Sequence, residues 1–357
     1  MEGPRLGDNR GLIHTRPLVL QRCRRFLLTG DLGVSPKSFL YPPRLGDYRG
    51  LTHLIPFLYV VSIMPEAVEI TEGIYRIETP VGVAQFHPTA FVIKNAETLI
   101  EPGPSISIPP IHQALKHLGI NKLRFIIPTH IHMDHAGGTG ALAKLYPDAT
   151  VLVHPRGLKH AIDPSRLIDS VKMVWGEDFD KNFGPITAVP ESQIQTVEDG
   201  ELIHAGDRNL QFIYTPGHAP HHIAIFDHKI KGLFCGEALG MPGYQLPTAA
   251  PMSFDLENYL STIDKLQHSD LDIRMLIYSH GSIEHNPDKC MSSAADNARA
   301  FGDIVQKAIE QGKSREETGN IINKYISERF GVNMDDLDFV TIATGYILYF
   351  EHLEKKK

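Results

Sequence analysis

Cysteine is scarce in this chain. Only Cys23, Cys235 and Cys290 occur among 357 residues, and no two of them stand at the spacing of a zinc finger. Three scattered cysteines exclude the disulfide framework that stabilises small secreted domains. We therefore expect a protein of a reducing compartment, the cytoplasm, whose length lets a hydrophobic core stabilise it without disulfides.

Long apolar runs are also lacking. No apolar stretch approaches the roughly 18–20 residues that a membrane-spanning helix needs. Arg22, Arg24 and Arg25 precede the apolar residues 26–28, but this stretch is too short for a signal peptide and no cleavage site follows it. Hydrophobic residues at 42% and charged residues at 22% are ordinary for a globular protein. The sequence predicts one large domain with appendages and no membrane partner.

The first 63 residues differ in composition from the rest of the chain. They contain nine Lys and Arg against four Asp and Glu, which gives this segment a net charge of +5. Because the whole chain has a net charge of −7, the residues after position 63 have a net charge of −12. Residues 5–14 and 44–53 form a near-repeat, and two copies are too few for a solenoid. Met64 offers a second start directly before the first strand-like residues. We interpret residues 1–63 as a disordered tail or a non-native upstream extension, with a small binding extension as the alternative.

The stretch THIHMDHAGG at residues 129–138 is the most informative in the chain. It follows the apolar run 124–128, which predicts a buried strand that ends at Pro128. Within six positions it places four side chains of the types that bind metals, namely His130, His132, Asp134 and His135. Such side chains on a loop held by a rigid sheet indicate a metal site.

The spacing within this stretch leaves room for two metal ions. His130 and His132 are two residues apart, so in an extended segment they point the same way. Asp134 and His135 follow as the chain turns toward a helix, so they can face a neighbouring point. Three further apolar runs lead to ligand-type residues at their ends, namely His218, Glu237 and His280. Because sites in open α/β sheets collect at one set of strand ends, we expect all of these side chains to meet.

These motifs, in this order, resemble those of the metallo-β-lactamase superfamily over about residues 66–285. The resemblance implies an α/β fold, the four-layer αβ/βα sandwich, with two metal ions at one edge. The ligands that it implies are His130, His132 and His218 for the first metal and Asp134, His135 and His280 for the second. Zinc suits this mixed set, and iron and manganese are alternatives.

Glu237 stands where most hydrolytic branches of the superfamily have a bridging aspartate. Its longer side chain can bridge the metals, bind one of them or push them apart, and a surface glutamate is the alternative. The β-lactamase branches proper lack a carboxylate here, so the resemblance disfavours an antibiotic-hydrolysing enzyme. Residues 215–222, TPGHAPHH, resemble the family's T-P-G-H-x-P-G-H, with His221 replacing a glycine. His222 then supports the ligands or faces the substrate, with an ordinary half-buried histidine as the alternative.

Other histidines lie in less suggestive surroundings. His112 and His117 belong to an expected amphipathic helix, and His154 follows an expected strand, so we interpret all three as structural. His87, before Pro88, lies in a loop that can approach the site. Glu101 opens the turn EPGP, where relatives carry a short D-x-G turn.

The chain divides into three predicted parts: the extension 1–63, a catalytic domain 64–285 and a C-terminal helical extension 286–357. The catalytic domain opens with strands around a turn at residues 72–73 and a hairpin around residues 94–97. Residues 160–196 are expected to be loop-rich with helical patches and to shape a substrate pocket. The C-terminal extension is predicted to contain three helices, over residues 291–311, 314–331 and 335–352, the second with a capping box. It resembles the helical additions of glyoxalase II-like branches, which roof the pocket, recognise a leaving group or make a homodimer contact.

The resemblance implies a hydrolase in which water activated between two metals attacks an electrophilic centre. Asp134 is the predicted catalytic residue, since a ligand carboxylate can also orient or accept the proton of that water. We expect a small-molecule substrate with a thioester or lactone bond. A phosphodiesterase or nuclease is the alternative, although about forty residues separate Glu237 from His280 and a negative core repels phosphate backbones. A non-hydrolytic iron redox enzyme or a metal-binding regulatory protein is a third interpretation.

Overall fold

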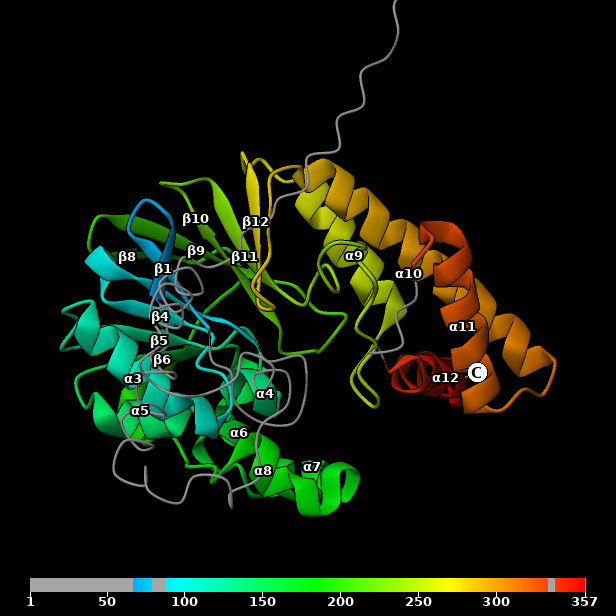
Figure 1. Cartoon of the computed structure of the whole chain (residues 1–357), viewed down its shortest axis with the longest axis horizontal. Coiled ribbons are helices and arrows are strands. Elements are labelled where there is room, and N and C mark those ends of the chain that lie inside the picture. Colours follow the sequence, from blue (N-terminus) through cyan, green and yellow to red (C-terminus); the bar gives the residue numbers. More distant parts are fainter. Residues whose placement is uncertain (1–66, 79–87, 333–337, 357) are drawn as a thin grey trace, which may run out of the picture. The chain divides into compact units, whose positions relative to one another are not determined.

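The computed structural model describes residues 67–78, 88–332 and 338–356. Our predictions for residues 1–63 and for His87 lie outside the described residues. The described residues form two sheets, shown with their helices in Figure 1.

The first sheet has the strand order β1-β2-β3-β4-β5-β6-β7. Its strands are β1 (Ala67–Thr71), β2 (Ile74–Ile77), β3 (Ala90–Ile93), β4 (Thr98–Ile100), β5 (Phe125–Ile127), β6 (Thr150–Val153) and β7 (Ile194–Thr196). The first four strands pair antiparallel, which confirms the predicted turn at residues 72–73 and the hairpin around 94–97. From β4 onward the pairing is parallel, so the chain must cross over between strands.

The second sheet has the order β13-β12-β11-β10-β9-β8. Its strands are β8 (Leu202–Ala205), β9 (Arg208–Tyr214), β10 (Ile223–Asp227), β11 (Gly232–Gly236), β12 (Met275–Tyr278) and β13 (Ile283–Glu284). Only β11 and β12 pair in parallel, and the helix α9 (Leu256–Gln267) makes the crossover between them. Glu237 and His280 follow these two strands, so parallel pairing brings both residues to the same edge of the sheet.

The two sheets pack face to face through a shared apolar core. Phe91 of the first sheet and Phe234 of the second meet edge to face with 5.6 Å between ring centroids. Neighbouring residues of β3 point the other way, because successive strand side chains alternate. Ala90 and Val92 therefore pack under the helices α3 (Ile108–His117) and α5 (Thr139–Leu145) instead of between the sheets. Because β3, β4 and β6 are buried on both faces, their sequences are nearly continuous apolar runs.

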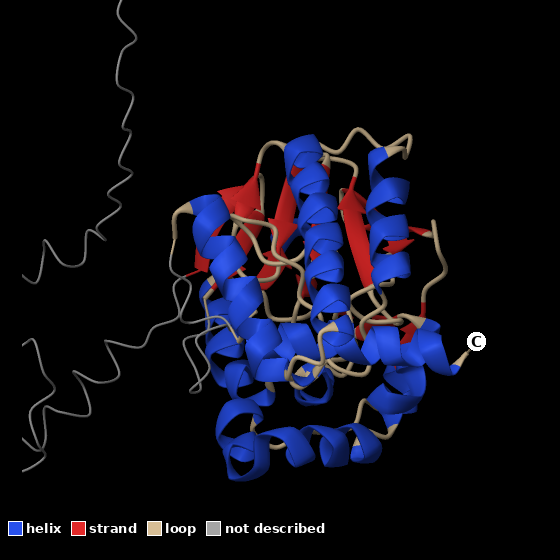
Figure 2. Ribbon diagram, turned by 90° about the vertical axis from the view of Figure 1, so that its right-hand side faces the viewer, coloured by secondary structure: helices blue, strands red, loops and turns tan. Residues whose placement is uncertain are grey.

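Helices cover the outer faces of both sheets and complete four layers. The core beneath the second sheet joins strand residues such as Leu276 to Tyr259 of α9 and to Phe301 of α10 (Pro287–Glu310). Figure 2 looks from the side of these helices, which lie in front of the strands. The predicted αβ/βα sandwich is thus confirmed.

The segment between β6 and β7 is more helical than predicted. It contains α6 (Leu158–Ile162), α7 (Ser165–Trp175) and α8 (Phe179–Phe183), where we expected a loop with helical patches. Leu167, Ile168 and Val171 form an apolar stripe on α7 that packs against Phe179 and Phe183. This stripe at helical spacing stabilises α7 by packing on its neighbours, which the loop-rich composition concealed.

The three C-terminal helices occur close to their predicted positions. The first, α10, begins at Pro287, four residues early, because the Asn286 side chain accepts a hydrogen bond from the Lys289 N–H and caps the helix. The second, α11 (Arg315–Phe330), has the predicted capping box between Ser314 and Glu317. The third, α12 (Phe339–Lys355), follows the Asp338 cap, and its predicted start at residue 335 lies outside the described residues. The division at residue 285 stays a prediction.

Of the helices in the described ranges, none combines the length and the apolar character required to span a bilayer.

Candidate metal centre

Residues 129–135, here called the donor segment, leave β5 and turn into α4 (Met133–Ala136). His132 is extended, with φ −61° and ψ 148°, and its carbonyl accepts the N–H groups of His135 and Ala136. His130 Nε2 lies 2.9 Å from His132 Nδ1, so the two rings converge as the alternation predicted. The short helix then carries Asp134 and His135, and the His135 ring packs against the His130 ring with 4.1 Å between centroids.

His218 completes the first group of nitrogen atoms. It follows β9, and its Nε2 lies 3.2 Å from His130 Nε2 and 3.0 Å from His132 Nδ1. Burial lowers the pKa of His132 to about 4 and holds the pKa of His130 well below its ordinary value. Burial also lowers the pKa of His218, but the Glu237 carboxylate outweighs burial and raises it. Three imidazoles that converge on a carboxylate are a donor set suited to a metal cation.

Glu237 joins the first group to a second one. Its Oε2 atom lies 2.9 Å from His218 Nε2, 3.5 Å from His130 Nε2 and 3.2 Å from His135 Nε2. Its Oε1 atom faces His280 Nε2 at 3.6 Å. Glu237 is 7% exposed, which contradicts the surface-glutamate alternative. Burial raises its pKa, but the surrounding histidines outweigh burial and hold the pKa well below its usual range.

Asp134 lies at the margin of this second group. Its Oδ2 atom is 3.4 Å from His135 Nε2, and its side chain is partly exposed. The compact set of second-group donor atoms comprises His135, Glu237 and His280. The structure therefore brings six predicted ligands together directly and places the seventh, Asp134, beside His135.

Glu101 is a site residue for which we predicted no role. This buried residue follows β4, and its Oε1 accepts hydrogen bonds from the hydroxyl groups of Thr129 and Ser279, each at 2.5 Å. Its Oε2 faces His135 Nδ1 at 3.2 Å. Burial lowers the pKa of His135, but the carboxylates of Asp134 and Glu101 outweigh burial and raise this pKa well above its ordinary value. The sequence feature that could have indicated a role for Glu101 was the EPGP turn at residues 101–104, which stands where relatives carry a D-x-G turn.

His222 supports the centre without contributing a donor atom. Its Nε2 accepts the Glu237 backbone N–H at 3.1 Å, and its Nδ1 lies 2.7 Å from the Thr215 hydroxyl. These two contacts agree with the prediction that His222 supports the ligands. They occupy both of its ring nitrogens, so neither is free to contact a substrate. The neighbouring His221 is partly exposed, and its Nδ1 faces the Ile131 N–H at 3.4 Å.

The histidines interpreted as structural lie away from the donor atoms. His112 Nδ1 is 2.9 Å from the Tyr146 hydroxyl. His154 accepts a hydrogen bond from the Arg156 N–H, and its ring packs on Tyr214 with 4.2 Å between centroids. His117 is exposed at the end of α3.

Unsatisfied polar atoms show that the donor set fits metal ions. Among the described residues, both ring nitrogens of His135 and Nδ1 of His280 are buried without a hydrogen-bond partner. Buried polar atoms are normally paired, so such a cluster needs an explanation. Two groups of imidazole and carboxylate donors, each within 4.8 Å, match the chemistry of a transition-metal site.

The fold and the donor groups agree with the comparison against known families. The sequence model of the metallo-beta-lactamase superfamily matches residues 85–280, and the chain belongs to this superfamily. The chain is 27% identical over 258 residues to the metallo-beta-lactamase fold-containing protein ST1585 of Sulfurisphaera tokodaii, covering 67% of this chain and 94% of that protein. It is 28% identical over 224 residues to a hydroxyacylglutathione hydrolase of Tolumonas auensis, covering 61% and 71%.

Solved structures give the same result. The crystal structure of ST1585, from Sulfolobus tokodaii, superposes with a TM-score of 0.52 over 63% of this chain and 86% of that one, at 27% identity. The metallo-beta-lactamase family protein TTHA1429 from Thermus thermophilus gives a TM-score of 0.58 over 81% and 95%. Its identity is 18%, so it bears on the fold alone. The predicted superfamily is confirmed.

Proposed function

We propose that this protein is a hydrolase that uses two divalent metal ions, zinc in our expectation, to cleave a thioester or lactone bond in a small molecule. The observation that carries the proposal is the position of Glu237. Its Oε2 faces His130, His218 and His135, while its Oε1 faces His280. A carboxylate shared by two histidine groups suits a dinuclear site, because it can face both ions.

His130, His132 and His218 would hold one ion, and His135, His280 and Asp134 the other, with Glu237 between them. When bound, such ions supply Lewis-acid polarisation and lower the pKa of coordinated water. Among the residues of this chain, Asp134 is the candidate that would accept a proton from the attacking water, because its carboxylate is partly exposed beside His135. Burial raises the pKa of Asp134, but His135 outweighs burial and lowers it to about 2, so the group is an acceptor at neutral pH.

Two observations support an ester-type substrate. Hydroxyacylglutathione hydrolases from several bacteria are among the relatives of this chain, at 25–30% identity. Only the segment containing α9 separates Glu237 from β12, so the nuclease branches with a large inserted domain are disfavoured. A phosphodiesterase and an iron redox protein remain the alternatives, and a homodimer contact through the C-terminal helices remains a prediction.

The test combines metal analysis with a substrate panel. We expect about two transition-metal ions per chain in the full-length protein. We also expect turnover of a thioester or lactone in preference to a β-lactam or phosphodiester. Turnover of the phosphodiester alone would contradict the substrate class, and a stoichiometry that saturates at one ion would contradict the dinuclear site.

A further inference from the structure

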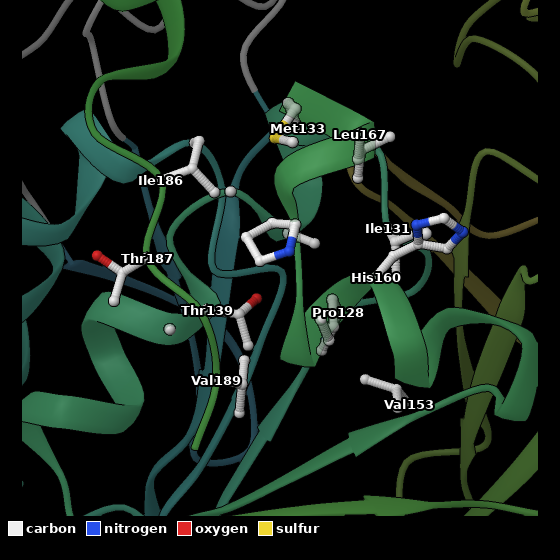
Figure 3. Close-up of a pocket in the computed structure, with 15 residues that line it drawn as sticks. Pro128, Ile131, Met133, Thr139, Val153, His160, Leu167, Ile186, Thr187 and Val189 are labelled. Carbon is white, nitrogen blue, oxygen red and sulfur yellow. The ribbon is translucent and has the colours of Figure 1, made fainter. Parts of the chain in front are cut away.

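The histidines of the first donor group are held by different parts of the molecule. His130 and His132 belong to the donor segment, and Ile131 between them lines the same small, largely apolar space as Val153 of β6 (Figure 3). These two ligands are therefore supported from the side of the first sheet. His218 follows β9 of the second sheet, so its position depends on a separate support.

The support of His218 is the loop that leads into α9. Residues 244–254, here called the support loop, contact His218 at three points. The Thr248 carbonyl lies 2.6 Å from His218 Nδ1 and the Thr248 hydroxyl 3.1 Å from it, while the Ser253 hydroxyl donates to the His218 carbonyl at 3.1 Å. A neutral imidazole that donates its Nδ1 proton to a carbonyl keeps a lone pair on Nε2. In His218 this Nε2 is the atom that faces His130 and His132.

The other side of the support loop packs on the C-terminal helices. Asn297 of α10 is fully buried, and its amide donates to the carbonyls of Tyr244 at 2.7 Å and Gln245 at 3.3 Å. At the far end of the loop, Phe254 packs on Tyr346 of α12 with 4.6 Å between ring centroids. Both ends of the loop are thus anchored on these helices, and its middle carries the contacts to His218.

The closest approach is between α12 and the residue that follows Thr248. Gly345 lies within α12, and a Cβ atom added there would collide with the Ala249 carbonyl. Ala249 is 2% exposed, so it has no solvent-filled space into which it could shift. Because Thr248 and Ala249 are consecutive, the position of α12 restricts where the Thr248 carbonyl can lie.

We propose that α10 and α12 position His218 for metal binding through the support loop. The C-terminal helices hold the Thr248 carbonyl at His218 Nδ1 and thereby set the affinity of the first donor group for its metal. Loss of such a partner behind a ligand typically costs about 10–100-fold in metal affinity. The coupling is reciprocal, so metal bound at His218 stabilises the contact between the loop and α12. This role rests on the metal site of the proposed function but not on its substrate.

The first test is a zinc titration of the full-length protein in competition with a chelator. Gly345→Ala adds the Cβ atom that displaces Ala249, so we expect the affinity of the first binding step to fall about tenfold. Asn297→Ala removes the amide that holds the other end of the loop, and we expect a smaller loss at the same step. The matched control is Gly319→Ala on α11, whose Cβ would lie 3.0 Å from the Val340 nitrogen of α12. It crowds the same helices without meeting the support loop, so both binding steps should stay unchanged.

Hydrogen exchange of the unaltered protein gives a second test that needs no variant. One equivalent of zinc should slow the exchange of amides in the support loop and around Gly345, while the exchange of α11 stays the same. Three results would overturn the proposal: unchanged exchange in the loop and α12, an unchanged first step in the folded Gly345→Ala and Asn297→Ala proteins, or an equal loss in Gly319→Ala. Each of them overturns the positioning role alone, since zinc binding itself would persist. A protein that binds no zinc would overturn both this role and the proposed function.

Discussion

The two donor groups of the candidate centre differ in how completely the fold has assembled them. In the first group, three nitrogen atoms lie within 2.9–3.2 Å of one another. In the second, the His135 and His280 rings lie edge to face with 5.8 Å between centroids, and both face the carboxylate of Glu237, at 3.2 Å and 3.6 Å. The nitrogen atoms of the first group thus lie closer together than those of the second, in which Glu237 stands between the two rings.

Contacts behind the rings explain the difference. In the first group, His218 Nδ1 lies 2.6 Å from the Thr248 carbonyl, and His130 Nδ1 lies 3.0 Å from the Thr129 hydroxyl. Such contacts fix the orientation and the tautomer of a ligand ring. In the second group, Glu101 restrains His135, but His280 Nδ1 has no hydrogen-bond partner in the described part of the chain. We therefore expect the first group to bind metal more tightly than the second.

The largest expected effect comes from removing a ligand of the tighter group. His130→Ala should remove both metals and lower kcat/KM by more than the ~10–100-fold that loss of a supporting residue costs. The measurement is metal content by mass spectrometry beside steady-state kinetics. His268→Ala, an exposed histidine on the far end of α9, is the matched control. Full activity in a metal-free His130→Ala protein would contradict a metal-dependent reaction.

Glu237→Gln tests the link between the two groups. Replacing one anionic oxygen with an amide should release the second metal, retain the first and lower kcat about 100-fold, because the shared charge is lost. Glu237→Asp should be milder, since it restores the residue that most relatives use, although the surroundings accommodate the longer side chain. Two metals and an unchanged rate in the Gln variant would remove Glu237 from the centre.

Glu101→Gln should act on the second group alone. The hydroxyl groups of Thr129 and Ser279 both donate to Oε1, so the amide oxygen should stay there and the amide NH₂ should face His135 Nδ1. His135 would then accept at Nδ1 and carry its proton on Nε2, where it cannot bind metal. We expect affinity for the second metal to fall about 10–100-fold, with the first unchanged.

The discriminating measurement is a competitive metal titration that resolves two steps. Glu101→Asp keeps the charge and should retain most of the second-step affinity. Equal weakening of both steps in Glu101→Gln would show that Glu101 serves the fold as a whole instead of the second group.

The smallest effect is expected from the N-terminal segment. A protein that starts at Met64 should bind both metals and turn over within about twofold of the full chain, since every donor and supporting residue named above lies beyond residue 100. Solubility, metal content and kinetics check this. An insoluble product, or one with most of its activity lost, would make residues 1–63 part of the folded protein.

Much of this architecture could be predicted from local patterns. Strands such as β3 and β6 are apolar because both of their faces are covered. The capping box of α11 was predictable because it lies within four consecutive residues. The clustering of donor side chains was predictable because four of the predicted ligands share one short stretch. Glu101 was not, since its partners Thr129 and Ser279 lie 28 and 178 residues away in sequence. The helical patches of residues 160–196 were predicted without bounds, because the apolar stripe of α7 is stabilised by Phe179 and Phe183, which follow it in the chain.

The position of Glu101 also bears on the order in which the protein matures. Thr129 follows β5 of the first sheet, and Ser279 follows β12 of the second. Both hydroxyl groups donate a hydrogen bond to the same buried carboxylate oxygen, Glu101 Oε1. Oε1 can accept both hydrogen bonds only after the sheets have docked, and a buried charge without these partners is costly. Unlike a zinc finger, which folds around its ion, this chain should complete its core before metal enters. We expect the metal-stripped protein to keep its native circular dichroism and to accept metal without refolding.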